Sequence, residues 1–299
     1  MLISVIIRTY NGRNSLLKEA VNSVLAQTYK NFEIIIIEDG GELAKPVADW
    51  LYNSMNCKGK YVSMGKVGRC VTGNKGLEIS SGEYVCFLDD DDQFYPDHLE
   101  KLIDAIEKYK VLAVYSDAEE VQTKFLSFEP LNYKEYGRNV IHNSDFSRVL
   151  MWRQNYIAIQ SVLFNRQLYI ENGGFLLHLD SLEDWNLWMR YSLKNDFYHV
   201  KNTTSFYRVP VGRKKALSRT RELDKYKQAI RDEQKSLSIN LNLDEFLTLH
   251  EELVKKESVF YISKDDVKKV LVDSICLNFL YSAFRIFYYK FFKRNKRGD

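Results

Sequence analysis

Apolar runs and amphipathic stretches alternate along the first 115 residues. The runs 2–7 and 32–37 are largely β-branched, which is typical of strands buried on both faces of a sheet. Between them, apolar residues recur at helical spacing from Leu16 to Leu25. The same pattern predicts further strands and helices in alternation. The strands are expected at 61–63, 84–88 and 111–115, and the helices at about 44–53 and 96–109. This order predicts an α/β fold with a mostly parallel central sheet and helices on both faces.

The pattern is looser beyond about residue 120. It predicts short strands at 161–164 and 197–200, a turn at 172–175 and one strong helix at about 182–193. From about residue 216 the chain is highly charged and helical. We therefore expect residues 1–120 and 121–215 to be two halves of one domain, and residues 216–299 to be a helical C-terminal extension.

Composition narrows the class of protein. The 299 residues are 45% hydrophobic and include only four prolines, so we expect one compact body without a flexible linker. A formal net charge of +3 gives no case for nucleic-acid binding. The four cysteines are widely spaced and the first residues resemble a strand rather than a signal peptide, which predicts a reduced, cytoplasmic protein. These cysteines are Cys57, Cys70, Cys86 and Cys276.

Four consecutive aspartates, Asp89 to Asp92, follow the predicted strand 84–88. Alternate side chains of an extended segment share a face, so Asp89 and Asp91 point one way and Asp90 and Asp92 the other. Carboxylate oxygens are the ligands that Mg²⁺ and Mn²⁺ prefer, usually completed by substrate phosphates. A solvated acidic turn that caps the helix near Pro96 is the alternative from the residues alone.

Other polar residues also stand at predicted strand ends, where α/β sheets bind ligands. Thr9 and Tyr10 follow the first strand and Asp39 follows the second. Asp39 precedes two glycines, so a simple turn is an alternative, and Glu38 is an alternative contact. "SLED" at 181–184 matches an N-terminal capping box, which would give Asp184 a purely structural role.

Four segments together resemble the family 2 glycosyltransferases, inverting enzymes with the GT-A fold. They are "SVIIRTYNGR", "NFEIIIIEDGG", "GNKGLEISSGEYVCFLDDDDQFYPDHLE" and "GGF…LEDWNLWMR", in the order and spacing of that family. The resemblance covers residues 1 to about 210. It implies a metal-dependent transferase of the hexosyltransferase type, in which residues 1–120 bind the nucleotide sugar and 121–215 the acceptor.

The resemblance also implies a role for each matching residue. The residues that it places at the nucleotide sugar are Thr9, Tyr10, Asp39, Arg69, Asn74, Asp89 and Asp90. Asp91, with Asp89, matches the metal ligands of the D-x-D motif for Mn²⁺ or Mg²⁺, and Asp92 matches a supporting carboxylate. Asp184 matches the catalytic base, with Glu183 as the alternative.

Two positions depart from the family pattern. Arg8 stands where many members have proline, and a guanidinium there can approach a phosphate or brace the loop. A histidine that ligates the metal in some members has no counterpart at 209–211, which puts a third protein ligand in doubt. The basic stretch 212–219 is interpreted either as a loop that closes over the diphosphate or as a solvated charge run.

Residues 290–299 carry five Lys or Arg and one Asp, and the preceding segment from 267 is apolar and aromatic with polar interruptions. No uninterrupted apolar span is long enough for a transmembrane helix, but a helix over 267–297 suits an anionic membrane surface. Packing on the body or on a second copy is the alternative, which leaves a homodimer open.

The resemblance and the tail together favour a peripheral enzyme on the inner face of the cell membrane. It would move a sugar from a nucleotide diphosphate, with UDP as the expected nucleotide, to a glycan or lipid-linked acceptor in cell-surface polysaccharide biosynthesis. A sugar-nucleotide nucleotidyltransferase ranks lower, because its first loop usually holds several glycines and a lysine whereas "RTYNGRNS" holds one glycine. A non-catalytic nucleotide-binding scaffold is the third candidate.

Overall fold

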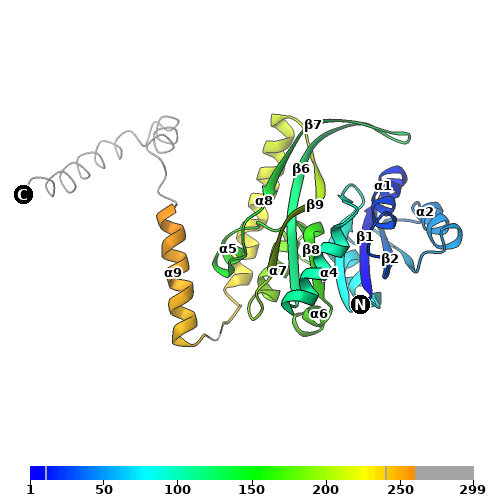
Figure 1. Ribbon diagram of the computed structural model, residues 1–299. Helices are drawn as coiled ribbons and strands as arrows, with labels where there is room; N and C mark the ends of the chain where they lie inside the picture. Colours follow the sequence, from blue (N-terminus) through cyan, green and yellow to red (C-terminus); the bar gives the residue numbers. More distant parts are fainter. Residues whose placement is uncertain (11, 240, 260–299) are drawn as a thin grey trace, which may run out of the picture. The chain divides into compact units, whose positions relative to one another are not determined.

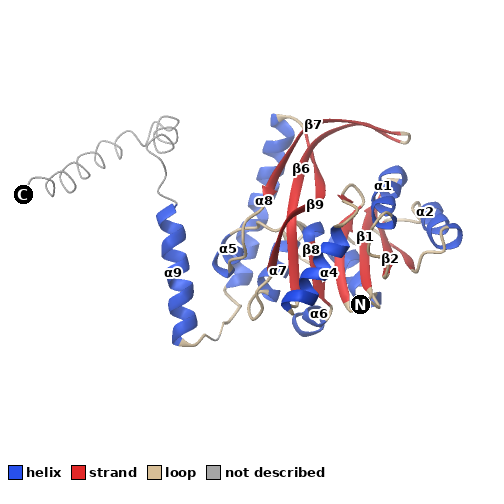
Figure 2. Cartoon of the chain, in the orientation of Figure 1, coloured by secondary structure: helices blue, strands red, loops and turns tan. Residues whose placement is uncertain are grey.

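The computed structural model describes residues 1–10, 12–239 and 241–259, and the elements follow one another as Figures 1 and 2 show. The strands are β1 (Ile3–Tyr10), β2 (Phe32–Asp39), β3 (Gly59–Met64), β4 (Tyr84–Asp89), β5 (Gln93–Phe94), β6 (Ala113–Phe128), β7 (Leu131–His142), β8 (Val162–Asn165) and β9 (Tyr198–Pro210). The helices are α1 (Asn14–Leu25), α2 (Lys45–Asp49), α3 (Arg69–Ile79), α4 (His98–Tyr109), α5 (Arg148–Arg153), α6 (Gln167–Asn172), α7 (Glu183–Tyr191), α8 (Arg213–Gln234) and α9 (Leu243–Val259). A π-helical turn (Trp50–Ser54) follows α2, and a 3₁₀ turn (Ile159–Ser161) precedes β8.

The strands form one sheet in the order β3-β2-β1-β4-β8-β6-β9-β5, and β7 pairs with β6. Strands β1, β2, β3 and β4 are parallel, whereas β8 runs antiparallel to both of its neighbours. Tyr10 is opposite Asp39, and Arg8 is opposite Asp89. The predicted mostly parallel sheet is therefore confirmed, and the carboxyl ends of β1, β2 and β4 lie side by side.

Two hydrophobic cores cover the two faces of the sheet. Alternation along β1 decides the split: Val5 and Ile7 face one core with α1 and α4, and Ile6 faces the other with α3, α5 and α7. Helix α3 lies close to β1, since a Cβ added at Gly76 would come within 2.4 Å of Ile6 Cγ2. The predicted helices on both faces are confirmed.

The structure differs from the expected pattern after residue 115. Strand β6 continues to Phe128 and turns into β7, a hairpin that the sequence analysis did not predict. Ala113 to Ser116 at the start of β6 are all buried, whereas from Asp117 onward only Ala118, Val121 and Thr123 are, so the outer part of the strand is covered incompletely. Of the two interpretations of the stretch 212–219, the closing loop is wrong, because helix α8 begins at Arg213.

Contacts divide the chain into one unit from Met1 to Ile239 and a second unit after it, of which α9 is the described part. Among the described residues, no helix is long and apolar enough to span a membrane. The predicted membrane-binding segment 267–297 lies outside the described residues.

Candidate active site

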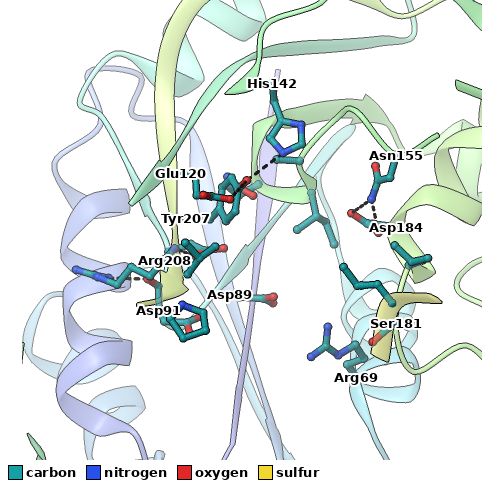
Figure 3. Close-up of a pocket in the computed structure, with 18 of the residues that line it drawn as sticks. Arg69, Asp89, Asp91, Glu120, His142, Asn155, Ser181, Asp184, Tyr207 and Arg208 are labelled. Atoms are coloured by element: carbon teal, nitrogen blue, oxygen red, sulfur yellow. Dashed lines mark hydrogen bonds between the residues drawn. The ribbon is translucent and has the colours of Figure 1, made fainter. Parts of the chain in front are cut away.

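A cavity of about 870 Å³ opens at the carboxyl ends of the parallel strands. Its lining comes from segments far apart in sequence, including the ends of β1 and β4, the start of α3, the α7 start and strands β6 and β9. Figure 3 shows Asp91 with Arg208 on one side, Asp184 with Asn155 on the opposite side, and Asp89 between them. The cavity thus brings together the D-x-D aspartates and the predicted base.

Arg8 pairs with the first aspartate of the run. Its guanidinium donates to both carboxylate oxygens of Asp89, with Nε–Oδ1 at 2.8 Å and Nη2–Oδ2 at 3.0 Å. Burial by itself would raise the pKa of Asp89, but the charge and hydrogen bonds of Arg8, together with the charges of Arg69 and Arg13, outweigh it and the pKa of that carboxyl is lowered. Arg8 is only 6% exposed and packs against the rings of Phe87 and Phe175. Asp89 is therefore held ionised and in a fixed orientation.

Arg13 pairs with the middle of the run. Its Nη1 lies 2.9 Å from Asp90 Oδ1 and its Nη2 lies 2.8 Å from Asp91 Oδ2. Asp90 is buried and also accepts a 2.7 Å hydrogen bond from the Thr9 hydroxyl. Asp91 has a side chain that is 30% exposed and lines the cavity, so of these two aspartates it is the one that faces a ligand.

Glu183 and Asp184 face different partners at the start of α7. Glu183 is buried and pairs with Arg8 at 3.2 Å and with Arg69 at 3.6 Å. Asp184 accepts hydrogen bonds at 3.2 Å from the Asn155 amide to each carboxylate oxygen. Burial and the adjacent charge of Glu183 raise the pKa of Asp184 to about 6, although Asn155 opposes the shift.

A carboxyl with that pKa in a cavity suits a general base near neutral pH. The capping-box alternative is wrong, because Leu182 precedes the first helical residue with φ of 61° and the α7 cap makes no side-chain hydrogen bond. A cap at Ser181 would require the helix to begin one residue earlier.

Of the residues predicted at the nucleotide sugar, only some line the cavity. Arg69 lines the cavity with a side chain that is 54% exposed, and Tyr10, the last residue of β1, is 47% exposed. Asp39 accepts hydrogen bonds from the backbone N–H groups of Val67 and Gly68, so it orders the loop before α3.

Two further side chains form hydrogen bonds to the backbone of neighbouring loops. Asn74 bridges the backbone N–H and C=O of Phe175, and Glu38 accepts from the backbone N–H groups of Leu43 and Ala44. The nucleotide roles of Asp39 and Asn74 stay predictions, and neither residue is among those that line the cavity.

The donor set fits a divalent cation at Asp91. Carboxylate oxygens suit Mn²⁺ or Mg²⁺, and Asp91 faces the cavity next to Asp89. In the described part of the chain no three His, Cys, Asp or Glu residues are grouped as a complete metal site. A site with one or two carboxylates is the kind that substrate phosphates complete.

Three lining or supporting residues were missed by the sequence analysis. Arg13 pairs with the aspartates, Asn155 holds Asp184, and Arg208 donates from its guanidinium to the Asp91 carbonyl and to Glu19. Four adjacent carboxylates in a folded protein require nearby cations, which is a signal for Arg13. The loop that carries Asn155 has no such signal, because its position depends on the fold.

A polar chain lines another part of the cavity. The Tyr207 hydroxyl donates to Glu120 at 3.2 Å, and His142 Nε2 lies 3.1 Å from that hydroxyl. The three side chains come from β9, β6 and β7 and lie together in Figure 3. The hairpin therefore contributes hydrogen-bonding groups to the cavity.

The sequence model that describes glycosyl transferase family 2 matches residues 4–173. The chain belongs to that family. A relative from Bacillus subtilis, the uncharacterized glycosyltransferase YwdF, is 33% identical over 64% of this chain and 68% of its own length. The uncharacterized glycosyltransferase RC0461 of Rickettsia conorii is 31% identical over 70% of this chain, which spans only 33% of that relative. The amylovoran biosynthesis glycosyltransferase AmsB of Erwinia amylovora is 30% identical over 43% of this chain and 45% of AmsB.

Solved structures confirm the GT-A fold of this family 2 chain. The mannosyltransferase PcManGT of Pyrobaculum calidifontis, in complex with GDP-Man and Mn²⁺, matches 96% of the chain and 80% of its own length with a TM-score of 0.59 and 16% identity. S. aureus TarS 1–349, in complex with UDP-GlcNAc, matches 71% of the chain and 60% of its own length with a TM-score of 0.56 and 19% identity. At these identities the likeness concerns the fold alone.

Proposed function

We propose that this chain is an inverting glycosyltransferase that moves a sugar from a nucleotide diphosphate, most simply a UDP-sugar, to a hydroxyl of a glycan or lipid-linked acceptor. One observation carries the proposal: the D-x-D aspartates and the carboxyl of Asp184, whose pKa is raised to about 6, line the same cavity. Family membership and neighbours solved with UDP-GlcNAc and GDP-Man support the donor class. The name of AmsB supports a role in polysaccharide biosynthesis.

In this mechanism Asp184 takes the proton of the acceptor hydroxyl as the oxygen attacks the anomeric carbon. The bond from that carbon to the diphosphate breaks, and its electron pair leaves with the diphosphate. A single displacement of this kind inverts the anomeric centre. Proton transfer to a positioned base contributes about 10²- to 10⁴-fold to the rate.

Asn155 holds the base for this step. By donating to both oxygens of Asp184 it favours the ionised form and fixes the plane of the carboxylate. Glu183 is the weaker candidate, because its buried carboxylate is already paired with Arg8 and Arg69.

The opposite wall receives the diphosphate. Asp91, with Asp89 beside it, would hold Mn²⁺ or Mg²⁺, and a bound metal supplies positive charge next to the leaving group. Arg69 is mostly exposed in the cavity and offers a further donor to the phosphate oxygens. Asp39, Thr9, Tyr10, Asn74 and Asp90 keep their proposed nucleotide-side roles, in which the buried members order the loops that form the pocket.

Thermal unfolding in the presence of UDP, GDP, dTDP and CDP, each with and without Mn²⁺, tests the donor side. A ligand at 100 times its Kd stabilises the native state by about 2.7 kcal/mol. We expect a metal-dependent rise for one nucleotide that Asp91→Asn loses and Asp104→Asn, a matched change of an exposed carboxylate on α4, keeps. Equal rises in both variants would remove Asp91 from the metal site.

Asp184→Asn separates an enzyme from a scaffold. We expect this variant to bind the nucleotide normally and to lose at least about 100-fold in sugar transfer or donor hydrolysis. Full activity in Asp184→Asn would contradict the base assignment. Release of pyrophosphate from a nucleoside triphosphate and a sugar phosphate would instead identify the nucleotidyltransferase alternative.

A further inference from the structure

The tip of the β6–β7 hairpin lies against the first turn of α1. Glu129, in the turn of the hairpin, accepts hydrogen bonds from the backbone N–H and the hydroxyl of Ser15 at 2.8 and 2.7 Å. Figure 1 shows the hairpin extending from the sheet toward α1. The chain thus joins its acceptor half to its nucleotide half through residues 114 positions apart.

Arg13 lies beside this contact and touches the hairpin tip itself. Its guanidinium lies 5.8 Å from the ring centre of Phe128 at the hairpin tip and 5.0 Å from that of Tyr10. The side chain is 12% exposed, and its Nε is buried without a hydrogen-bond partner among the described residues. The cation is therefore held by two aromatic rings and by the two aspartates, Asp90 and Asp91.

The contact to Asp91 conflicts with metal binding. Arg13 Nη2 donates to Asp91 Oδ2 at 2.8 Å, and a divalent cation would coordinate through the same carboxylate. A guanidinium and a metal that use one carboxylate compete for its lone pairs and for its charge. Asp90 gives Arg13 a second partner at 2.9 Å, so Arg13 keeps an ion pair when Asp91 changes partner.

We propose that Arg13 is a positioning residue that competes with the divalent cation for Asp91, and that Phe128 and Glu129 hold it in the competing position. The inference rests on the proposed function, because it takes Asp91 as the residue that holds the cation. If a site is open in only a fraction of the molecules, its apparent Kd equals the intrinsic Kd divided by that fraction. The metal alone then binds weakly, and metal and nucleotide diphosphate bind tightly only together, since the diphosphate adds ligands for the metal and negative charge for the released Arg13.

Mn²⁺ binding to the full chain without nucleotide tests this directly, with free Mn²⁺ measured by its electron paramagnetic resonance signal. We expect Arg13→Gln to lower the Kd for Mn²⁺ about ten-fold, which is the weight of one charge-assisted hydrogen bond. Arg69→Gln is the matched control, since it also removes one positive charge near the aspartates but its ion-pair partner is Glu183. Phe128→Ala, at a side chain that is 45% exposed, is expected to lower the Kd about three-fold through loss of the cation–π contact.

An Arg13→Gln protein that binds Mn²⁺ no more tightly than Arg69→Gln would overturn the competition. An unchanged Kd in Phe128→Ala would overturn the role of the hairpin tip, and this variant also decides the matter if Arg13→Gln does not fold. A parallel titration of the native chain with UDP and Mn²⁺ judges the proposed function separately. If nucleotide binding is normal while every variant keeps the native Mn²⁺ affinity, the inference fails and the proposed function stands.

Discussion

Arg8→Met removes the charge at the centre of the cavity and keeps a side chain of similar length against Phe87 and Phe175. In the native chain Arg8 neutralises Glu183, whose side chain is 4% exposed, and Asp89, whose side chain is 30% exposed. Removing one partner of a buried ion pair costs about 3–5 kcal/mol. We expect the lower end of that range, because Asp89 is partly exposed to water and Arg69 still lies 3.6 Å from Glu183 and partly neutralises it.

We therefore expect Arg8→Met to lower the free energy of unfolding by about 3 kcal/mol, measured by urea denaturation with circular dichroism. Adding Glu183→Gln removes the stranded buried charge and should restore about half of that loss. Arg148→Met is the matched control: Arg148 Nε also donates to an aspartate at 2.8 Å, but that partner, Asp196, is 68% exposed. This control should cost about 1 kcal/mol or less.

The reasoning is refuted if Arg8→Met costs no more than Arg148→Met. It is equally refuted if the double variant with Glu183→Gln is less stable than Arg8→Met alone. Either result would mean that water reaches Glu183 in the native chain.

Three further predictions concern a base, a close contact and a buried imidazole. Because burial and Glu183 raise the pKa of Asp184 to about 6 and a base acts ionised, kcat/KM should rise with pH through about 6 to a plateau. Asn155→Ala should move that inflection upward by about one unit, and an unmoved inflection would contradict the hydrogen bond's role. Gly76→Ala should cost about 1–3 kcal/mol of unfolding free energy because its Cβ would lie 2.4 Å from Ile6 Cγ2, whereas Gly65→Ala, with open space around it, should cost less than 1 kcal/mol in the same assay. Burial lowers the pKa of His98 to about 3, so only the unfolded chain gains a proton between pH 7 and 5 and native stability falls by about 2 kcal/mol. His98→Gln should abolish that part of the fall in urea titrations at the two pH values, and an equal fall in both proteins would show that His98 is protonated in the native state.

Much of the first half of the fold could be predicted from local patterns. The runs that form β1, β2 and β4 consist mostly of apolar side chains. Such runs are expected to be buried on both faces of a sheet, and they are. Amphipathic spacing placed α1 and α4 to within two residues of their ends. Helix α8 was expected from about residue 216, but its highly charged start at Arg213 was interpreted as a loop or a solvated charge run.

The hairpin of β6 and β7 was missed for a related reason. Near the tip, β6 and β7 pair with each other and with no other described strand. Both strands there carry a mixture of exposed apolar and charged side chains. Such a pattern carries little periodicity, since neither face is fully buried. The contact of the hairpin tip with α1, from Ser15 to Glu129, joins residues 114 positions apart, which no local window of sequence contains.

The sequence by itself determined the alternation of strands and helices, the family and the strand ends at which the acidic residues stand. Only the tertiary structure decided which cation meets which carboxylate. Arg8 is 81 residues from Asp89 and 175 from Glu183, and Arg13 is 78 from Asp91. Those separations become hydrogen-bond distances because the parallel register of β1 and β4 and the packing of α7 bring the ends together. Electrostatic pairing depends on distance in space, and a linear sequence does not contain that distance.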